Sequence, residues 1–483
     1  MTVQQLSGLD ASFLYMETSR TFGHVSSLSI YEHPRDADFD PFEALRNQVA
    51  SRLHLIEPLR RRLVEVPFGL DRPYWVADPD FDLDFHVRHL GLAGPGTTEQ
   101  LTEQVARIIA RALDRTKPLW ELYVIEGLDT GDFAVLTKIH HAAIDGASGV
   151  EMMSILLDHE PDSIQPEQPA ESSKLDAIPS ALELLGRASV NMARNPARAT
   201  RITLRSLGEL AKAARRVDLA NTFDALQRRL RPRSDDQRDR PPLLPRISAP
   251  ATPFNKAITA HRRFAIGSAP LDDVKAIKNR LGVSINDVVM AVCAGGLRRY
   301  LDKHGVLPTE PLVAMVPVST RSGEEADKWT NRVSALLAAL PTDVEDPVQR
   351  VLAMHETMNA AKQRFDLMPA DLIMDFTQLA MPALATRAIR LVAATRIVDR
   401  VNPPMNLVIS NVPGPRQPLY AAGARMKHYY PVSTITDGQG LNITVQSYTD
   451  TLDFGLVSCR ELVPDVWDLL QFCLDEVQQL KDG

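Results

Sequence analysis

The sequence has few cysteines, and they lie far apart. Its 483 residues include three, Cys293, Cys459 and Cys473, and none of them belongs to a C-x-x-C pair. Disulfide-bonded secreted domains and structural zinc sites both need cysteines that come in sets. The scarcity therefore predicts a protein of a reducing, cytoplasmic compartment, without a disulfide framework and without a zinc site of this kind.

Secretory and membrane-spanning signals are also lacking. The first ten residues, Met1 to Asp10, contain neither the basic region nor the apolar core of a signal peptide. No uncharged apolar run reaches the roughly 20 residues that are needed to cross a bilayer. We therefore expect any contact with a membrane to be peripheral.

A strong basic excess is missing too. Lys and Arg number 54 and Asp and Glu number 61, which gives a net charge of −7. Because proteins that bind nucleic acids usually carry clustered positive charge, we expect no nucleic-acid partner. Hydrophobic residues at 44% and charged residues at 24% are ordinary values for globular proteins. The chain is long enough for two or three domains with sizeable cores.

Several catalytic motifs are absent. There is no G-x-x-x-x-G-K-[ST] phosphate-binding loop and no strand–G-x-G-x-x-G–helix unit for a dinucleotide. The segment Gly146-Ala147-Ser148-Gly149 misses the G-x-S-x-G nucleophile elbow by one position. These absences argue against a covalent serine hydrolase and against enzymes built on those nucleotide sites.

The residues that are present predict an α/β protein with two halves joined by a linker. Strands and helices alternate in residues 1–165 and again in residues 251–483, which favours a mixed sheet covered by helices in each half. The basic part of the linker at 166–250 runs from 187 to 240 and holds 14 Lys and Arg against 6 Asp and Glu, an excess of 14 − 6 = +8. It is interpreted either as a solvated connector or as a surface segment attracted to anionic lipid.

Local patterns place the individual elements. In the first half we expect strands at 25–31, 122–125 and 133–139, and helices at 42–53 and 101–113. In the second half we expect a helix at 288–297, capped by Ser284 and Asp287, and strands at 312–319, 440–445 and 453–458, the last two being neighbours. The stretch 370–400 predicts a helix whose basic face lies either over core packing or at a membrane interface.

One motif gathers groups suited to catalysis. His140-His141-Ala142-Ala143-Ile144-Asp145-Gly146 follows the predicted strand at 133–139, and the spacing of Ser148 and Glu151 predicts that a helix begins just beyond. Because side chains alternate along a strand, His140 and His141 should point to opposite sides, one into a cleft and one inward. Asp145 is suited to orient a histidine, cap the helix or pair with an arginine, and Gly146 permits unusual backbone angles.

The histidine pair favours a base that works without a protein nucleophile. A neutral imidazole, with an ordinary pKa of about 6.5, is suited to take a proton from an alcohol or an amine. Adjacent histidines on a strand lack the helical i, i+4 placement of H-E-x-x-H, which argues against a zinc site. The remaining chemistry is direct acyl transfer from an activated donor such as a thioester, because the acceptor hydroxyl itself can attack.

The motifs resemble those of the bacterial wax ester synthase/diacylglycerol acyltransferase family, within the superfamily of coenzyme-A-dependent acyltransferases that share H-H-x-x-x-D-G. The resemblance runs almost from end to end. It is carried by Leu9-Asp10-Ala11-Ser12-Phe13-Leu14, Pro118-Leu119-Trp120, His140 to Gly146, Asn286-Asp287, Pro317-Val318-Ser319-Thr320-Arg321 and Ser410-Asn411-Val412-Pro413-Gly414-Pro415.

The resemblance implies two chloramphenicol-acetyltransferase-like halves with a channel between them. His141 would be the general base and His140 would support the site, and Gly146 would belong to the same catalytic set. Asp145 would be structural and paired with an arginine, for which Arg321 is one candidate.

It also implies a substrate-binding set made of Asn286, Asp287 and Arg321, in which Asn286 would position the acyl chain or polarise the thioester carbonyl. The alternative for Asn286 and Asp287 is a plain helix cap.

The implied substrates are long-chain acyl-CoA as donor, with no separate cofactor, and diacylglycerol or a long-chain alcohol as acceptor. The implied location is the cytoplasm, in peripheral contact with the inner face of the membrane or with lipid droplets. Two alternatives stay open. One is a condensation-type acyltransferase that esterifies polyketide or glycolipid alcohols. The other is an inactive lipid-binding or lipid-droplet protein, although the intact histidine motif argues against it.

Overall fold

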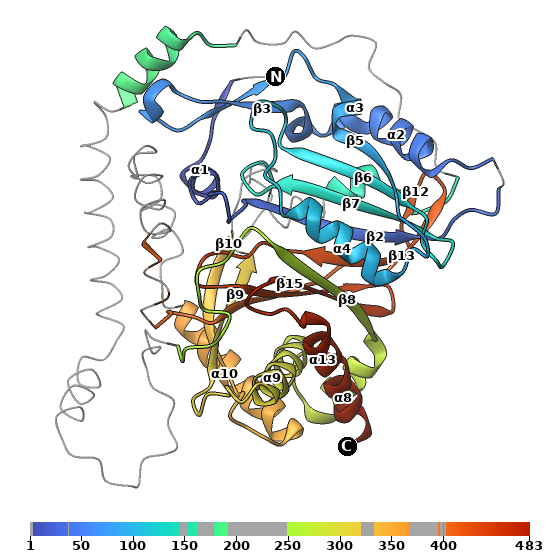
Figure 1. Cartoon of the computed structure of the whole chain (residues 1–483), viewed down its shortest axis with the longest axis vertical. Coiled ribbons are helices and arrows are strands. Elements are labelled where there is room, and N and C mark those ends of the chain that lie inside the picture. The colour runs from blue at the N-terminus through green and yellow to red at the C-terminus, as the bar shows by residue number, and fades with distance from the viewer. Residues whose placement is uncertain are drawn as a thin grey trace.

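The computed structural model describes residues 3–36, 38–144, 152–162, 178–191, 249–319, 333–366, 395–396, 399 and 402–483. Two six-stranded sheets lie one above the other, and a three-stranded sheet extends the first (Figure 1). Helices cover the outer face of the second sheet (Figure 1). The predicted mixed α/β architecture with two sheet-containing halves is confirmed.

The first sheet has the strand order β12-β13-β2-β7-β6-β5. Its central pair is antiparallel and places His24 opposite His140 and Tyr31 opposite Phe133. The strands that the first half of the chain contributes to this sheet are β2 (His24–Tyr31), β5 (Val87–Gly91), β6 (Trp120–Glu126) and β7 (Phe133–His140). Branched and aromatic side chains predominate in β6 and β7, and such residues fit a pleated, buried surface.

The other elements of the first half pack around this sheet. They are α1 (Gly8–Tyr15), α2 (Pro41–Arg52), α3 (Leu83–His86), α4 (Thr98–Ile109), a helix at 181–191, the 3-10 turns η1 (Leu53–Leu55), η2 (Glu57–Arg60) and η3 (Pro67–Gly69), and the small sheet of β1 (Gln4–Gln5), β4 (Tyr74–Ala77) and β3 (Arg61–Val64). A capping box of Thr97 and Gln100 begins α4, whose Leu101 and Val105 pack in one cluster with Leu28 of β2. An apolar stripe thus fixes α4 on the sheet.

The second sheet has the order β10-β9-β11-β14-β15-β8. β11 runs parallel to β9 and β14, and the other neighbours are antiparallel. Its strands are β8 (Arg262–Pro270), β9 (Leu312–Ser319), β10 (Val333–Leu340), β11 (Leu407–Val412), β14 (Leu441–Tyr448) and β15 (Thr451–Cys459). The helices on its outer face are α8 (Leu271–Leu281), α9 (Ile285–Lys303), α10 (Pro347–Asp366) and α13 (Val466–Asp482). Together they enclose the largest apolar core.

Part of the second half joins the first sheet. After β11 the chain forms β12 (Tyr420–Ala421) and β13 (Ala424–Val432), and β13 pairs with β2 of the first sheet. The chain then returns to the second sheet as β14. Sheet membership therefore does not follow the divisions at 165 and 251 throughout, and those domain boundaries stay predictions.

The predicted elements that fall on described residues are found. The expected strands correspond to β2, β6, β7, β9, β14 and β15, and the expected helices to α2, α4 and α9. The capping box of Ser284 and Asp287 is present at α9, and β14 and β15 are neighbours. Asp145, Gly146 and Arg321, the helix start at Ser148, most of the linker and most of the stretch at 370–400 lie outside the described residues.

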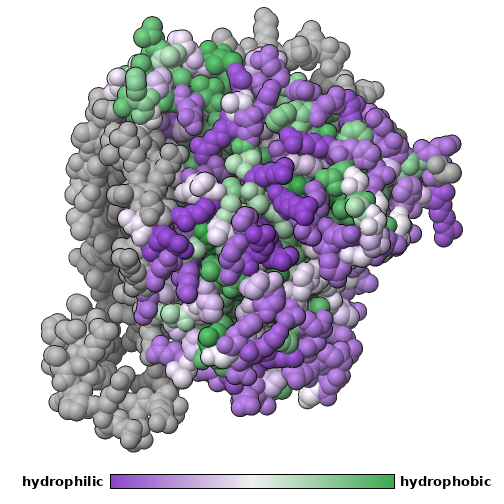
Figure 2. All heavy atoms as spheres, in the orientation of Figure 1, coloured by the Kyte–Doolittle hydropathy of each residue, from purple (hydrophilic) through white to green (hydrophobic). Residues whose placement is uncertain are grey.

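Hydrophilic side chains cover much of the described surface on the face shown in Figure 2, with hydrophobic ones interspersed. In the part of the chain that the structure describes, no single helix is both long and apolar enough to cross a membrane. Among the described helices, α8 and α9 meet that length and composition test only when taken together, and they are bent by 104° at their junction.

Candidate active site

The histidine pair lies at the end of β7. Backbone hydrogen bonds join it to the residues that directly precede the neighbouring strands β6 and β2. The N–H of His140 donates to the carbonyl of Leu119 at 2.9 Å, and the N–H of His141 donates to the carbonyl of Gly23 at 2.8 Å. Leu119 and Trp120 are buried, and the indole N–H of Trp120 donates to Leu59. The Pro118-Leu119-Trp120 segment therefore anchors the strand end that carries the histidines.

His140 points into the protein. It is 1% exposed, and its Nδ1 accepts a hydrogen bond from the N–H of Ala142 at 3.0 Å. Because Nδ1 accepts, a neutral His140 carries its proton on Nε2. The expected inward orientation of one histidine is observed for His140.

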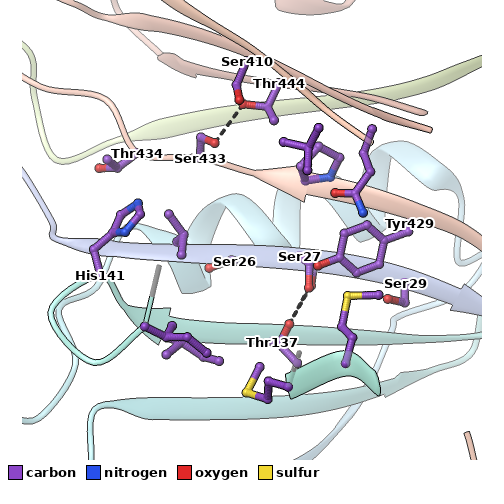
Figure 3. A pocket seen from close by; sticks show the side chains of 18 of the residues that line it. Ser26, Ser27, Ser29, Thr137, His141, Ser410, Tyr429, Ser433, Thr434 and Thr444 are labelled. Atoms are coloured by element: carbon purple, nitrogen blue, oxygen red, sulfur yellow. Dashed lines mark hydrogen bonds between the residues drawn. The ribbon is translucent and has the colours of Figure 1, made fainter. Parts of the chain in front are cut away.

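His141 points the other way, into a cavity between the two sheets (Figure 3). Its ring stacks on Phe13 of α1, with the centroids 4.6 Å apart and the planes at 13°. Stacking restricts the rotation of the imidazole, so its nitrogens keep a fixed direction relative to the cavity. The residue thus has the exposure and the orientation that a base requires.

The cavity has a volume of about 590 Å³. Alternate residues of β7 line it, followed by His141 just beyond the strand: Val135, Thr137, Ile139 and His141. Residues of β2 also line it, namely Val25, Ser26, Ser27, Ser29 and Tyr31. Residues of the second sheet line it as well, among them Met315, Pro317, Val408, Ser410 and Val412. Both sheets therefore contribute to one largely apolar cavity of a size typical for small-molecule sites.

Hydroxyl groups are set into this apolar lining. Ser27 and Thr137 are hydrogen bonded at 2.5 Å, and Ser433 and Thr444 at 2.8 Å (Figure 3). Paired hydroxyls satisfy each other, so they are compatible with a bound alkyl chain. Among the described residues, no group of three or more His, Cys, Asp or Glu side chains is arranged to hold a metal ion.

The predicted substrate-binding residues lie at the start of α9, and neither Asn286 nor Asp287 lines the cavity. Asp287 accepts from the N–H of Ser284 at 2.9 Å and contacts Nδ1 of His355 at 2.7 Å, so it has the helix-capping contact of the alternative interpretation. Asn286 accepts a hydrogen bond of 3.3 Å from Asn411, whose neighbour Ser410 lines the cavity. The third member of that set, Arg321, and the motif residues Asp145 and Gly146 lie outside the described residues.

Three residues near the histidines were given no role in the site by sequence reasoning. Glu17 has a side chain that is 9% exposed and lies 3.2 Å from Nε2 of His140. The carbonyl of Gly23 accepts a hydrogen bond from the N–H of His141, and the ring of Phe13 stacks on the ring of His141. Phe13 belongs to a segment that carried the family resemblance, and Glu17 and Gly23 follow it closely, so their shared position just before β2 was the available signal.

Comparisons with known proteins identify the family of this chain. Residues 6–289 match the wax ester synthase/diacylglycerol acyltransferase catalytic domain, and residues 329–481 match the WS/DGAT C-terminal domain. A protein of Mycobacterium tuberculosis named as a probable diacylglycerol O-acyltransferase is 36% identical over 483 residues, which cover 98% of each chain.

Among solved structures, the wax ester synthase/diacylglycerol acyltransferase of Marinobacter aquaeolei is similar with a TM-score of 0.69 and 30% identity, covering 99% of this chain and 98% of that one. The first condensation domain of the CDA synthetase has a TM-score of 0.54 at 18% identity, covering 99% of this chain and 95% of that one, a likeness in fold alone. The chain therefore belongs to the wax ester synthase/diacylglycerol acyltransferase family and is an acyltransferase.

Proposed function

We propose that this acyltransferase transfers a long acyl chain from acyl-CoA to the hydroxyl of diacylglycerol or of a long-chain alcohol, giving triacylglycerol or a wax ester. The observation that carries the proposal is the apolar cavity of about 590 Å³ with His141 on its wall. Such a lining suits alkyl chains, because burying apolar surface is favourable at roughly 25 cal/mol per Å². The names of the family relatives support the two acceptor classes, diacylglycerol and wax-ester-forming alcohols.

His141 acts as the general base in this proposal. It takes the proton of the acceptor hydroxyl while the oxygen attacks the thioester carbonyl carbon and forms the new C–O bond. The tetrahedral oxyanion then collapses, the C–S bond breaks, and the proton on His141 passes to the departing CoA thiolate. The products are the ester and free CoA, and His141 returns to its neutral form.

The other predicted residues are assigned supporting parts. His140 sets the direction of the strand end, Asp145 is kept as a structural residue, and Gly146 is kept as a member of the catalytic motif. Asn286 acts on the cavity wall through Asn411, to which it is hydrogen bonded. Asp287 holds the start of α9, and Arg321 is kept as the candidate partner of Asp145. We further propose that the protein works in peripheral contact with the inner face of the membrane or with lipid droplets, where both lipid substrates are available.

The test supplies purified protein with labelled palmitoyl-CoA and, separately, diacylglycerol or hexadecanol. His141→Ala should lower turnover by about 100-fold or more, the usual contribution of a general base. The matched control is His89→Ala, since His89 is a half-exposed histidine of β5 that pairs with Glu126.

Label in one neutral lipid, with His141→Ala silent and His89→Ala active, supports the proposal and identifies the acceptor. Release of CoA without ester formation would overturn the acceptor assignment and favour condensation-type alcohols. Vesicle binding without any transfer would favour the lipid-binding alternative.

A further inference from the structure

The loop between α1 and β2 passes directly against the histidine pair. In its last residue, Gly23, both the backbone N–H and the backbone carbonyl form hydrogen bonds. The Gly23 carbonyl accepts from the N–H of His141 at 2.8 Å, and the Gly23 N–H donates to Oε1 of Glu17 at 2.8 Å. One backbone unit therefore ties the carboxylate of Glu17 to the main chain of His141.

Both oxygens of the Glu17 carboxylate are used. Oε1 accepts the hydrogen bond from the Gly23 N–H. It also lies 3.2 Å from Nε2 of His140, but the Nε2–H of His140 is not aligned for a full hydrogen bond. Oε2 accepts from Nη2 of Arg115 at 2.7 Å and from Nε of Arg115 at 3.2 Å. Arg115 also donates to the carbonyl of Leu14 in α1 at 2.7 Å. A charge-assisted network thus links α1, the loop and the end of β7.

The charge state of Glu17 fits this arrangement. Burial disfavours ionisation of the carboxyl, but the contacts with His140, the Gly23 N–H and Arg115 outweigh it and lower the pKa of Glu17 to about 2. Glu17 is therefore an anion at neutral pH. An anion next to the Nε2–H of His140 also favours the tautomer in which Nδ1 accepts from Ala142.

The close approach leaves no room for another residue at position 23. A Cβ on Gly23 would lie 2.6 Å from Nε2 of His140 and 2.9 Å from the carbonyl oxygen of Phe13, closer than real Cβ contacts. Both neighbours belong to the site, since Phe13 stacks on His141. Glycine is needed here for contact distance and not for an unusual backbone angle.

Residues of the second half also contact this loop. Thr434 donates to the carbonyl of Phe22 at 2.6 Å and lines the cavity with His141. Arg262 donates to the carbonyl of Arg20, and its guanidinium lies 5.3 Å from the centroid of the Phe22 ring. The loop is therefore fixed by residues from both halves. Gly23, which follows Phe22, accepts the hydrogen bond from the N–H of His141.

We propose that Glu17 is a positioning residue for His141, and that the loop from Glu17 to Gly23 transmits the placement of the base from both halves of the molecule. Glu17 acts through the Gly23 peptide and through His140 and does not touch the substrate. The proposal rests on the proposed function, in which His141 is the base.

The experiment compares Glu17→Ala and Glu17→Gln with Glu126→Gln, a matched control in which the exposed carboxylate paired with His89 is changed. In the acyl-transfer assay, Glu17→Ala should lower kcat by about 100-fold, the cost expected when a reacting group is displaced by about 1 Å. KM should stay near the wild-type value, because the cavity lining is unchanged. Glu17→Gln retains the acceptor oxygen for Gly23 and should recover part of kcat, and Glu126→Gln should match wild type.

A second variant keeps the test decisive where Glu17→Ala folds poorly. Thr434→Val keeps the side-chain shape but removes the hydrogen bond to Phe22, and should lower kcat about fivefold with the thermal unfolding midpoint unchanged. Folded Glu17→Ala with wild-type kcat, or a loss confined to KM, would overturn the positioning role. Failure of the proposed function is distinguishable, because it would appear as a wild-type protein that makes no ester or as an active His141→Ala.

Discussion

In the half built on the first sheet, one arginine–carboxylate pair lies beside the histidine pair, whereas in the second half another lies between helices. Glu17 and Arg115 form an ion pair of 2.7 Å next to His140. Arg350 of α10 and Glu476 of α13 also form an ion pair, and their side chains are only 3% and 2% exposed. Each half thus contains an arginine–carboxylate pair, but Arg115 of the first pair is 36% exposed, whereas the second pair is fully buried.

The surroundings indicate different roles. Gly295 of α9 lies so close to the second pair that a Cβ there would be 2.3 Å from Cδ of Glu476. Neither Arg350 nor Glu476 lines the cavity. We infer that the pair in the second half fixes the packing of three helices, while the pair in the first half fixes the strand end that carries His141. The comparison predicts that stability and activity can be changed separately.

The largest effect on stability is expected from Arg350→Met. Burial lowers the pKa of Arg350 and raises the pKa of Glu476, so each charge depends on its partner. Removal of the arginine should lower the free energy of unfolding by about 3–5 kcal/mol, because Glu476 would stay buried without a counter-charge. Urea denaturation measures this, and the kcat of the folded variant should equal that of wild type.

The double variant Arg350→Met, Glu476→Leu is the control for this interpretation. Replacing both charges with apolar side chains should restore most of the lost stability, since a buried ion pair often contributes little relative to a hydrophobic pair. A fully folded Arg350→Met protein with a reduced kcat would break the comparison, because the second pair would then also act on the site.

A smaller, pH-dependent effect is expected from Glu17→Gln. The pKa of Glu17 is about 2 in the folded protein against an ordinary value of 4.5. The carboxylate therefore adds stability that is present above pH ~4.5 and is lost as the pH falls toward 2, a contribution of about 3 kcal/mol. The free energies of unfolding of wild type and Glu17→Gln should differ by this amount at pH 7 and by clearly less at pH 3. Equal differences at both pH values would show that the charge of Glu17 is not what stabilises the network.

Much of the framework could be predicted because its signals are local. The run before His140 predicts a strand, and alternation along that strand predicts opposite directions for His140 and His141, as observed. The spacing of Ser284 and Asp287 predicts the start of α9. Each of these inferences uses residues within a few positions of one another, where backbone geometry limits the possibilities.

The rest depends on contacts between residues far apart in the chain. Glu17 meets Arg115 across 98 positions, and Thr434 meets Phe22 across 412. No periodicity or spacing reports such pairs. For the same reason the sequence did not predict that β13 would complete the first sheet. Asn286 and Asp287 were assigned to substrate binding by family resemblance, and their distance from the cavity lining became visible only in the fold.

The smallest effect that we predict is a change in the preferred length of the substrate chain. It is tested by comparing a substitution on the cavity face of β7 with one on β10, at the edge of the second sheet. Val135 lines the cavity six residues before His141, which along a strand corresponds to roughly 20 Å. Val135→Phe should fill that end of the cavity and lower the rate with the longest chain about tenfold relative to the shortest, as expected for overpacking by 1–3 kcal/mol.

The measurement uses an acyl-CoA series from octanoyl to stearoyl with one acceptor, and an alcohol series of the same lengths with one donor. The control is Leu337→Phe on β10, where the side chain is 37% exposed and does not line the cavity. The series that loses its long members identifies which substrate chain extends along β7 away from His141. Unchanged profiles in both series would mean that neither chain reaches Val135, and the bound chains would then have to lie along the second sheet, between Met315 and Val412.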